Sequence, residues 1–328
     1  MGNKINKSKK SESKLKEKEK KLKENDYLYN NFDINEKKLS LKVNYHNAEI
    51  YRICLLDDGR LVSSSYDKNI IIYNKRTYKP DIIIKEHKGY VYDIISLNPN
   101  MLASCSGDKT VKIFKITGNM YKILQTLKEH KRNVYRLIEL KNKNLVSSSY
   151  DKSIILYSKD INNNKYKKYY KILTNEHFLS VVQTKDNEIC YPVHNNIYFF
   201  DLGEKKDICS ISNVDGPGVY STFNMITKDL LIIGSKYNLF VVNVIHYKII
   251  RKIELLNYFG ISGFCMVNER TFLTTCILNI LQWKIEGDDI KIISTKEKAH
   301  NLRINYIIKI GNGKIASCGY DKSIKIWQ

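Results

Sequence analysis

The sequence lacks the features that mark several common classes of protein. It contains only four prolines in 328 residues, and no apolar stretch reaches the roughly 18 residues needed to span a membrane. The N-terminus is rich in lysine and has no apolar segment of the kind found in secretory signals. We therefore expect a cytoplasmic or nuclear protein, with neither a secretory signal nor a transmembrane segment.

Paired cysteines and catalytic motifs are also absent. The seven cysteines are scattered and none belongs to a CxxC pair, so we expect reduced and mostly buried thiols. There is no Walker loop, HExxH or GxSxG sequence. The sequence thus predicts a protein that is not an enzyme and has no metal site and no cofactor.

Positive charge is present in excess. The net charge is +21, of which residues 1–25 contribute +6 through ten Lys and four Glu, so the rest of the chain carries +15. A basic globular body favours acidic partners, which include acidic protein surfaces, nucleic acid and anionic membranes.

An internal repeat accounts for most of the chain. Four segments align without gaps: SSSYDKNIIIYN, SCSGDKTVKIFK, SSSYDKSIILYS and SCGYDKSIKIWQ, which begin at Ser63, Ser104, Ser147 and Ser317. In each segment an Asp precedes an aromatic residue by six positions, and a His lies 27 positions before that aromatic. Three weaker copies extend the series, whose units end at Tyr73, Phe114, Tyr157, Phe200, Val242, Trp283 and Trp327. Seven units of 41 to 44 residues predict seven sheets of four strands.

Over residues 38–328 this repeat resembles that of the WD-repeat family. The resemblance implies an all-β fold, a seven-bladed β-propeller of four-stranded blades. In that family a His, a Ser or Thr, the turn Asp and the aromatic residue form a hydrogen-bonded tetrad. The matching sets here are His46/Ser63/Asp67/Tyr73, His87/Ser104/Asp108/Phe114, His130/Ser147/Asp151/Tyr157 and His300/Ser317/Asp321/Trp327. Because a nucleophile is needed only once, we interpret these recurring Asp–His–Ser sets as structural rather than catalytic.

Some tetrads are incomplete. Phe114 has no group that donates a hydrogen bond, and in blades four to six the turn Asp is replaced by His194, Lys236 and Ile277. These three blades are therefore expected to be less rigid.

The two ends of the propeller sequence predict how the ring closes. Trp327 ends the third strand of the last blade and only one residue follows it, so the outer strand must come from elsewhere. Leu39, Leu41 and Val43 alternate with polar residues, as in a half-buried strand, and we expect this segment to close the ring. Residues 1–37 are expected to form a charged, flexible or marginally helical extension, and residues 38–328 a monomeric propeller. This layout partly resembles that of a G-protein beta subunit.

The resemblance also indicates a binding surface. In WD-repeat proteins the residue before the turn Asp, and the one five positions after the His, tend to face the narrow top surface where partners bind. The corresponding residues are Tyr66, Tyr150 and Tyr320 at the first position and Tyr51, Tyr92 and Tyr135 at the second, with Tyr90 and Arg303 beside them. Tyr and Arg are enriched at binding hot spots, so we expect these eight residues to contact a partner.

Three functions are compatible with the sequence. The first is a non-enzymatic scaffold or adaptor whose top face binds proteins that have acidic surfaces. The second is a basic propeller that docks on nucleic acid or a ribonucleoprotein. The third is an N-myristoylated membrane adaptor with Gly2 as the lipidation site, although Asn6 stands where the motif requires Ser or Thr.

Overall fold

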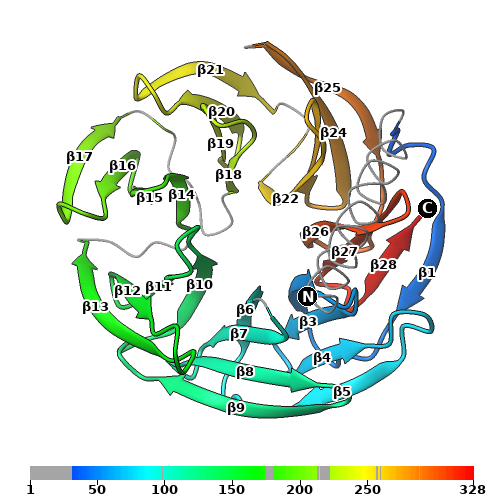
Figure 1. Ribbon diagram of the computed structural model, residues 1–328. Coiled ribbons are helices and arrows are strands. Elements are labelled where there is room, and N and C mark those ends of the chain that lie inside the picture. The colour runs from blue at the N-terminus through cyan, green and yellow to red at the C-terminus, as the bar shows by residue number, and fades with distance from the viewer. Residues whose placement is uncertain are drawn as a thin grey trace, which may run out of the picture.

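In the part of the chain that the structure describes, twenty-eight strands form seven antiparallel sheets of four strands, arranged as the blades of a ring (Figure 1). The computed structural model describes residues 32–97, 99–174, 180–212, 214, 222–255, 258, 260–287 and 289–328. Within these ranges no helix has the length and hydropathy needed to cross a membrane. The all-β, seven-bladed architecture predicted from the repeat is confirmed.

Blades one to four follow one another around the ring, each with its strands in chain order from the innermost to the outermost. Blade one contains β2 (Ile50–Leu55), β3 (Leu61–Ser65), β4 (Ile70–Tyr73) and β5 (Pro80–Ile84). Blade two contains β6 (Val91–Leu97), β7 (Met101–Ser106), β8 (Val111–Thr117) and β9 (Met120–Leu127). Blade three contains β10 (Val134–Glu139), β11 (Leu145–Ser149), β12 (Ser153–Lys159) and β13 (Tyr166–Leu173). Blade four contains β14 (Val182–Lys185), β15 (Glu188–Val193), β16 (Asn196–Asp201) and β17 (Lys206–Ile211).

Blades five and six repeat this order, and blade seven departs from it. Blade five contains β18 (Phe223–Met225), β19 (Leu230–Gly234), β20 (Asn238–Asn243) and β21 (Lys248–Glu254). Blade six contains β22 (Ile261–Asn268), β23 (Thr271–Cys276), β24 (Asn279–Glu286) and β25 (Asp289–Lys296). Blade seven combines β26 (Ile304–Gly311), β27 (Lys314–Gly319) and β28 (Ile324–Trp327) with β1 (Leu39–Val43) from the other end of the chain.

The position of a strand within its blade explains its sequence. The second strands β3, β11 and β19 are buried along their whole length and consist of apolar and small residues (LVSSS, LVSSS and LLIIG). Strands that neighbouring blades cover on both faces need such continuous runs rather than alternation. The outer strand β13 (YKKYYKIL) exposes several of its lysines, because only part of its surface is covered.

The residue that ends each repeat unit marks the same structural feature in all seven blades. Pairing between the third and outer strands shifts register at Tyr73, Phe114, Tyr157, Phe200, Val242, Trp283 and Trp327. A β-bulge at this point bends the strand pair and increases its local twist. The three weaker copies are therefore true members of the series.

Strand β1 closes the ring as predicted. It pairs antiparallel with β28, with Lys42 opposite Lys325 and Val43 opposite Ile324. The expected burial is only partly correct: Val43 is buried, but Leu39 and Leu41 are 46% and 37% exposed. The register shift between these two leucines breaks the simple alternation assumed from the sequence.

A second contact ties the N-terminal segment to blade six. Phe32 and Ile34 are buried in a cluster that includes Leu273, Ile280 and Trp327. The backbone N–H of Ile34 donates to the Gln282 Oε1 atom at 2.7 Å, and the Gln282 side chain donates to the Phe32 carbonyl. The sequence had no signal for this contact, which joins blades six and seven through the same segment that supplies β1.

We expect removal of residues 1–44 to destabilise the propeller far more than removal of residues 1–30. The longer deletion removes β1 together with Phe32, Ile34 and Val43, and burial of one such side chain stabilises by about 1.5–3 kcal/mol. Urea unfolding should show a difference of about 5 kcal/mol or more between the two truncations. Equal midpoints would contradict closure of the ring by this segment.

Candidate functional site

The predicted tetrads place their members within hydrogen-bond distance of one another. In blade one His46 Nδ1 lies 2.7 Å from Asp67 Oδ2, and His46 Nε2 lies 2.7 Å from Ser63 Oγ. The hydroxyls of Ser63 and Tyr73 are 2.9 Å apart. The same His–Asp and His–Ser contacts occur in blades two, three and seven.

The fourth member of the tetrad differs between the blades. Trp327 Nε1 donates to Ser317 Oγ at 2.9 Å in blade seven. In blade three Tyr157 is hydrogen-bonded to Ser147. Phe114 offers no polar group, so the blade-two set has three hydrogen-bonding members.

The chemistry of these groups fixes the direction of the bonds. A carboxylate only accepts, so His Nδ1 carries the proton that it donates to Asp. In the neutral imidazole, Nε2 then accepts from the Ser hydroxyl, whose oxygen accepts from Trp327 in blade seven. Burial lowers the pKa of His300 and so favours this neutral form, although the neighbouring Asp321 acts in the opposite direction.

Each tetrad Asp also joins a turn to a loop. Asp67 accepts from the backbone N–H of Asn47 in the loop before β2 and from that of Asn69 in the β3–β4 turn. Burial alone would raise the pKa of Asp108, but the hydrogen bonds from His87, Thr110 and the backbone N–H of Lys88 hold that pKa well below its usual range. The pKa values of Asp67, Asp151 and Asp321 are lowered in the same way, because burial is outweighed by the hydrogen bonds to each carboxylate.

Blades four to six turn differently where the Asp is replaced. Two residues, His194 and Asn195, connect β15 to β16, and Ile277 and Leu278 connect β23 to β24. Blade six nevertheless keeps an indole–hydroxyl bond, since Trp283 Nε1 donates to Thr274 Oγ1 at 2.8 Å. Short turns thus replace the Asp-centred turns of the other blades.

Seven tyrosines form one continuous cluster on the rim where the His-bearing loops meet the Asp-bearing turns. We call this rim the top face, and the tyrosine cluster comprises Tyr51, Tyr66, Tyr90, Tyr92, Tyr135, Tyr150 and Tyr320. The ring centroids of Tyr66 and Tyr90 are 4.2 Å apart and stacked, and those of Tyr92 and Tyr135 are 4.3 Å apart. Tyr51 donates to the Tyr66 hydroxyl at 2.7 Å, and its own hydroxyl lies 3.2 Å from that of Tyr320.

The predicted contact residues are not equally accessible. Tyr90 and Tyr150 are 45% and 38% exposed, whereas Tyr92 is buried and supports the cluster from below. Arg303 points toward blade six. Its Nη2 atom approaches Gly260 so closely that a Cβ atom at this glycine would be 3.5 Å away. The structure therefore brings all seven tyrosines together and places the Arg303 guanidinium beside blade six.

The backbone holds the cluster in place. The N–H groups of Tyr66, Tyr150 and Tyr320 each donate to a carbonyl in the preceding loop at 2.8–3.0 Å. Blade two has Gly107 at this position, and a Cβ there would lie 3.4 Å from the Tyr92 ring. The missing side chain leaves room for Tyr90 and Tyr92, so the cluster runs without a break from blade seven to blade three.

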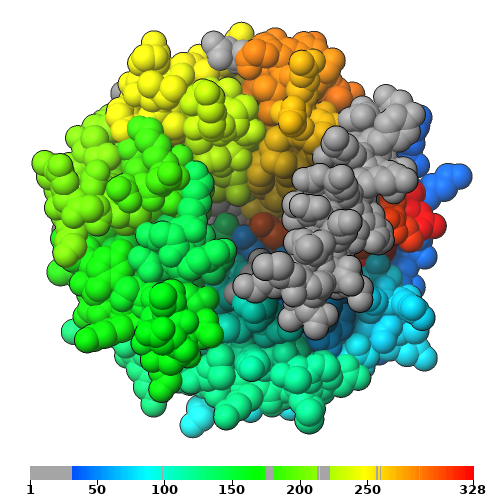
Figure 2. All heavy atoms as spheres, in the orientation of Figure 1, coloured from blue at the N-terminus to red at the C-terminus, as the bar shows by residue number. Residues whose placement is uncertain are grey.

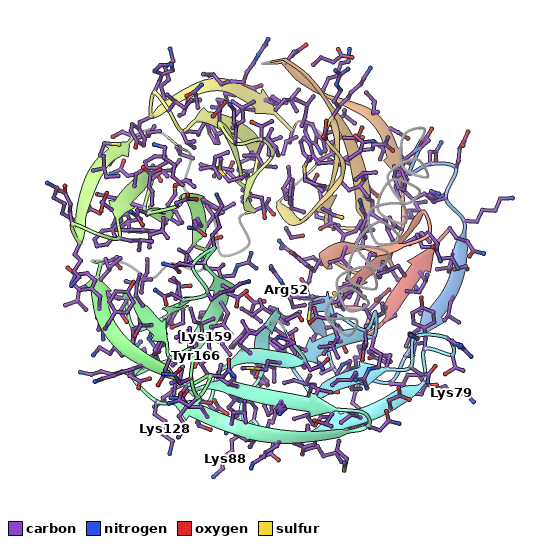
Figure 3. The ribbon with its side chains drawn as sticks, in the orientation of Figure 1. Arg52, Lys79, Lys88, Lys128, Lys159 and Tyr166 are labelled. Carbon is purple, nitrogen blue, oxygen red and sulfur yellow. The ribbon has the colours of Figure 1, made fainter. Side chains whose placement is uncertain are left out.

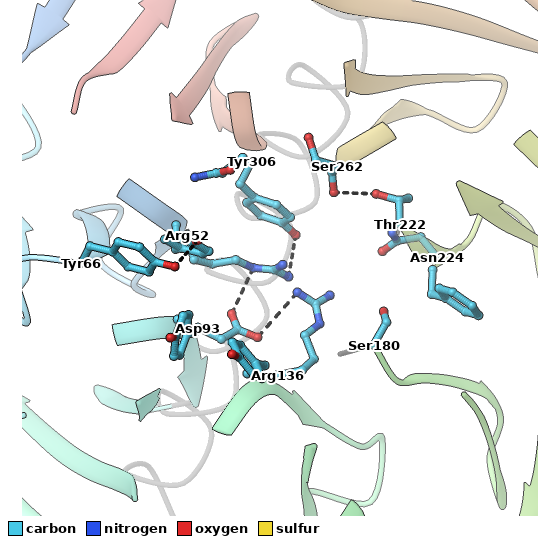
Figure 4. A pocket seen from close by; sticks show the side chains of 14 residues that line it. Arg52, Tyr66, Asp93, Arg136, Ser180, Thr222, Asn224, Ser262 and Tyr306 are labelled. Atoms are coloured by element: carbon cyan, nitrogen blue, oxygen red, sulfur yellow. Dashed lines mark hydrogen bonds and ion pairs between the residues drawn. The ribbon is translucent and has the colours of Figure 1, made fainter. Parts of the chain in front are cut away.

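A cavity of about 220 Å³ opens in the mouth of the central channel, next to the tyrosine cluster (Figure 4). Its charged residues lie on the innermost strands of blades one to three, each six positions after a tetrad His: Arg52, Asp93 and Arg136. Figure 2 shows the hollow at the centre of the ring. These residues were not predicted from the sequence, although charged side chains that recur at one position of a buried strand could have indicated a polar site.

Asp93 is the centre of this group. Its carboxylate lies 3.1 Å from Arg52 Nε and 3.5 Å from Arg136 Nη1, and it accepts from the backbone N–H groups of Ile94 and Leu137. Burial raises the pKa of Asp93, and Arg52 and the two N–H groups oppose this effect. Two backbone hydrogen bonds and two ion pairs with arginine are the environment of an ionised carboxylate, so we assign Asp93 as charged.

The described residues also contain potential metal ligands and cysteine thiols. Within them, His, Cys, Asp and Glu side chains nowhere gather in a group of three or more that would hold a metal ion. Burial raises the pKa values of Cys54, Cys265 and Cys276 to about 12, so these thiols are poor nucleophiles. Gly2, the predicted lipidation site, lies outside the described residues.

We expect the substitution Asp151→Asn to reveal the tetrad as a pH-dependent source of stability. An Asp whose folded pKa lies below its unfolded value of about 3.9 stabilises at neutral pH, and this contribution is lost as the pH falls through the folded pKa. The variant should lose about 2 kcal/mol or more of unfolding free energy at pH 7, with a smaller difference as the pH falls from about 4 to about 2.

Urea unfolding of both proteins across this pH range measures the effect. Asp186→Asn is the control, because the Asp186 side chain is 84% exposed, and it should change stability little. A loss for Asp151→Asn that stays constant from pH 7 to pH 2 would show that its charge plays no part.

The comparison with known proteins agrees with this geometry. The model of the WD domain, G-beta repeat matches residues 37–74, 78–115, 121–158 and 294–328, the four repeats that contain the tetrads. The first match includes β1, which is the outer strand of blade seven, together with strands of blade one. One sequence repeat therefore spans two neighbouring blades, and this offset closes the ring. No curated protein matches the chain. Propellers built from such repeats are generally non-enzymatic platforms for protein interaction. The chain is thus a seven-bladed β-propeller that contains four WD repeats.

Proposed function

We propose that this protein is a scaffold or adaptor that binds a partner protein through its top face, with the tyrosine cluster as the principal contact surface. The observation that carries the proposal is the continuity of the cluster, in which seven rings from four adjacent blades contact one another. A single partner segment that crosses the rim would meet several of them at once.

The tyrosines are suited to this role because they are already ordered. A tyrosine buries a large area for little loss of side-chain entropy and keeps a hydroxyl for hydrogen bonding. Stacking and hydroxyl contacts hold these rings in place without a partner, so little entropy remains to be lost on binding. Tyr90 and Tyr150, the most exposed members, would make the first contacts.

Charge around the cluster favours an acidic partner. An exposed lysine directly follows each tetrad Asp, at Lys68, Lys109, Lys152 and Lys322. Figure 3 places Lys88 and Lys128 at the circumference of the ring, whereas Arg52 points into the central opening. Basic residues around an aromatic centre would steer an acidic segment toward the tyrosine cluster.

We expect the triple substitution of Tyr66, Tyr150 and Tyr320 by alanine to abolish recovery of the partner in a pull-down followed by mass spectrometry. Each hot-spot tyrosine contributes about 2 kcal/mol or more, so the combined loss exceeds what the assay detects. The fold should persist, because these side chains lie outside the tetrads.

Two control variants make this result interpretable. Replacement of Tyr169 and Tyr237, which are exposed but lie outside the cluster, should leave partner recovery unchanged. Asp151→Ala should instead damage folding. Unchanged partner recovery with the triple variant would place the binding surface elsewhere, and capture of nucleic acid with a steep loss in added salt would favour the nucleic-acid alternative.

A further inference from the structure

Arg136 in the mouth of the central channel has unused hydrogen-bonding capacity. Its Nη1 atom lies 3.5 Å from Asp93, and its Nε atom is buried without a hydrogen-bond partner in the described part of the protein. Arg52 is better satisfied, since its Nε pairs with Asp93 and its Nη2 donates to the Tyr306 hydroxyl at 3.0 Å. Because 15% of the Arg136 side chain is exposed at the cavity, its guanidinium can accept a further hydrogen-bonding partner there.

The charge of the group favours an anion with a single negative charge. Two guanidinium groups face one carboxylate, which leaves one positive charge uncompensated. The other side chains that line the cavity from described residues are neutral and include Ser180, Thr222, Asn224 and Ser262. A carboxylate would neutralise the group, whereas a phosphate dianion would leave it negative.

The position of the group makes it reachable beside the tyrosine cluster. The Arg52 and Arg136 side chains are 16% and 15% exposed, and both face the cavity in Figure 4. Tyr51, Tyr66, Tyr92 and Tyr135 from the tyrosine cluster form part of the same lining. With about 220 Å³, the cavity is smaller than a site for a drug-sized molecule and suits a single side chain.

We propose that the mouth of the central channel is a subsite for one carboxylate group, from an Asp or Glu side chain of an acidic protein segment, with Arg136 as its main ligand. This inference rests on the proposed function, because the tyrosine cluster would hold the backbone on either side of that residue. Arg52 and Asp93 orient Arg136 and set the charge of the subsite. An acidic residue next to an aromatic or apolar one is therefore the partner chemistry that fits.

The experiment uses the full chain and small probes of defined charge. N-acetyl-glutamate α-amide carries the carboxylate, N-acetyl-glutamine α-amide is its neutral equivalent, and N-acetyl-O-phosphoserine α-amide carries a phosphate. Each is titrated while the arginine Nε–Hε signals are followed by NMR at fixed salt. We expect the glutamate probe to shift the Arg136 signal saturably in the millimolar range, and the glutamine probe to leave it in place.

Two substitutions form a matched pair. In both variants binding is followed through the Nε–Hε signal of Arg52, which lines the same cavity. Arg136→Gln should weaken binding of the glutamate probe at least tenfold, whereas Arg132→Gln, at an exposed arginine outside the cavity lining, should leave it unchanged. Arg136→Lys keeps a positive charge beside Asp93, so if Arg136→Gln does not fold, this variant should still weaken the probe severalfold.

The remaining outcomes overturn the proposal in distinct ways. The subsite is refuted if the glutamate probe gives no saturable shift, or if the glutamine probe shifts the signal equally. Tenfold tighter binding of the phosphoserine probe would replace the carboxylate by a phosphate. If the glutamate probe fails while the triple tyrosine variant still loses its partner, the proposed function stands and only the subsite falls.

Discussion

The hydrogen bond between a loop histidine and a turn aspartate is the interaction on which the top face depends. In blades one, two, three and seven it fixes the distance between the loop that enters a blade and the turn between its second and third strands. The carboxylate also accepts backbone N–H groups from both segments, so loop and turn become one rigid unit. Four tyrosines of the cluster lie on these loops and turns, and Tyr51, Tyr92 and Tyr135 lie near the start of the adjoining innermost strands. The rigid units thus hold the backbone beneath the stacked rings.

Blades four to six show what the ring tolerates when this interaction is lost. Their shorter turns satisfy the backbone locally, and other polar groups take over inside the blades. Glu188, which is buried, accepts from Thr184, Lys185 and Tyr247, and so connects blade four to blade five. Ser262 and Thr275 in blade six form a similar local set. These contacts stabilise blades four to six, and among the described residues the tyrosine cluster does not extend onto them.

The fold decides where the positive charges of the chain lie. Most lysines are scattered over exposed loops and outer strands, where each contributes little alone. The two arginines of the channel mouth differ, because they are half-buried beside Asp93, where charges are screened less than on the surface. The Arg52 guanidinium also lies 3.6 Å from the centre of the Tyr306 ring. Long-range attraction would bring an acidic segment to the ring, and the channel mouth would then set its register on the tyrosine cluster.

The sequence alone determined the seven blades and the members of each tetrad, because both follow from fixed spacings within one repeat. It also determined the pairing of β1 with β28, because only one residue follows Trp327 and the last blade needs a fourth strand. Six of the seven tyrosines were also found at two recurring positions, with Tyr90 beside them, but their contacts with one another required the angle at which neighbouring blades pack. Only the tertiary structure placed Phe32 and Ile34 against blade six and left Leu39 and Leu41 exposed. It also turned Arg303 toward blade six and brought Arg52, Asp93 and Arg136 together. Those contacts form between residues some 40 to 250 positions apart, where no local spacing rule applies and the packing of whole sheets decides which side chains meet.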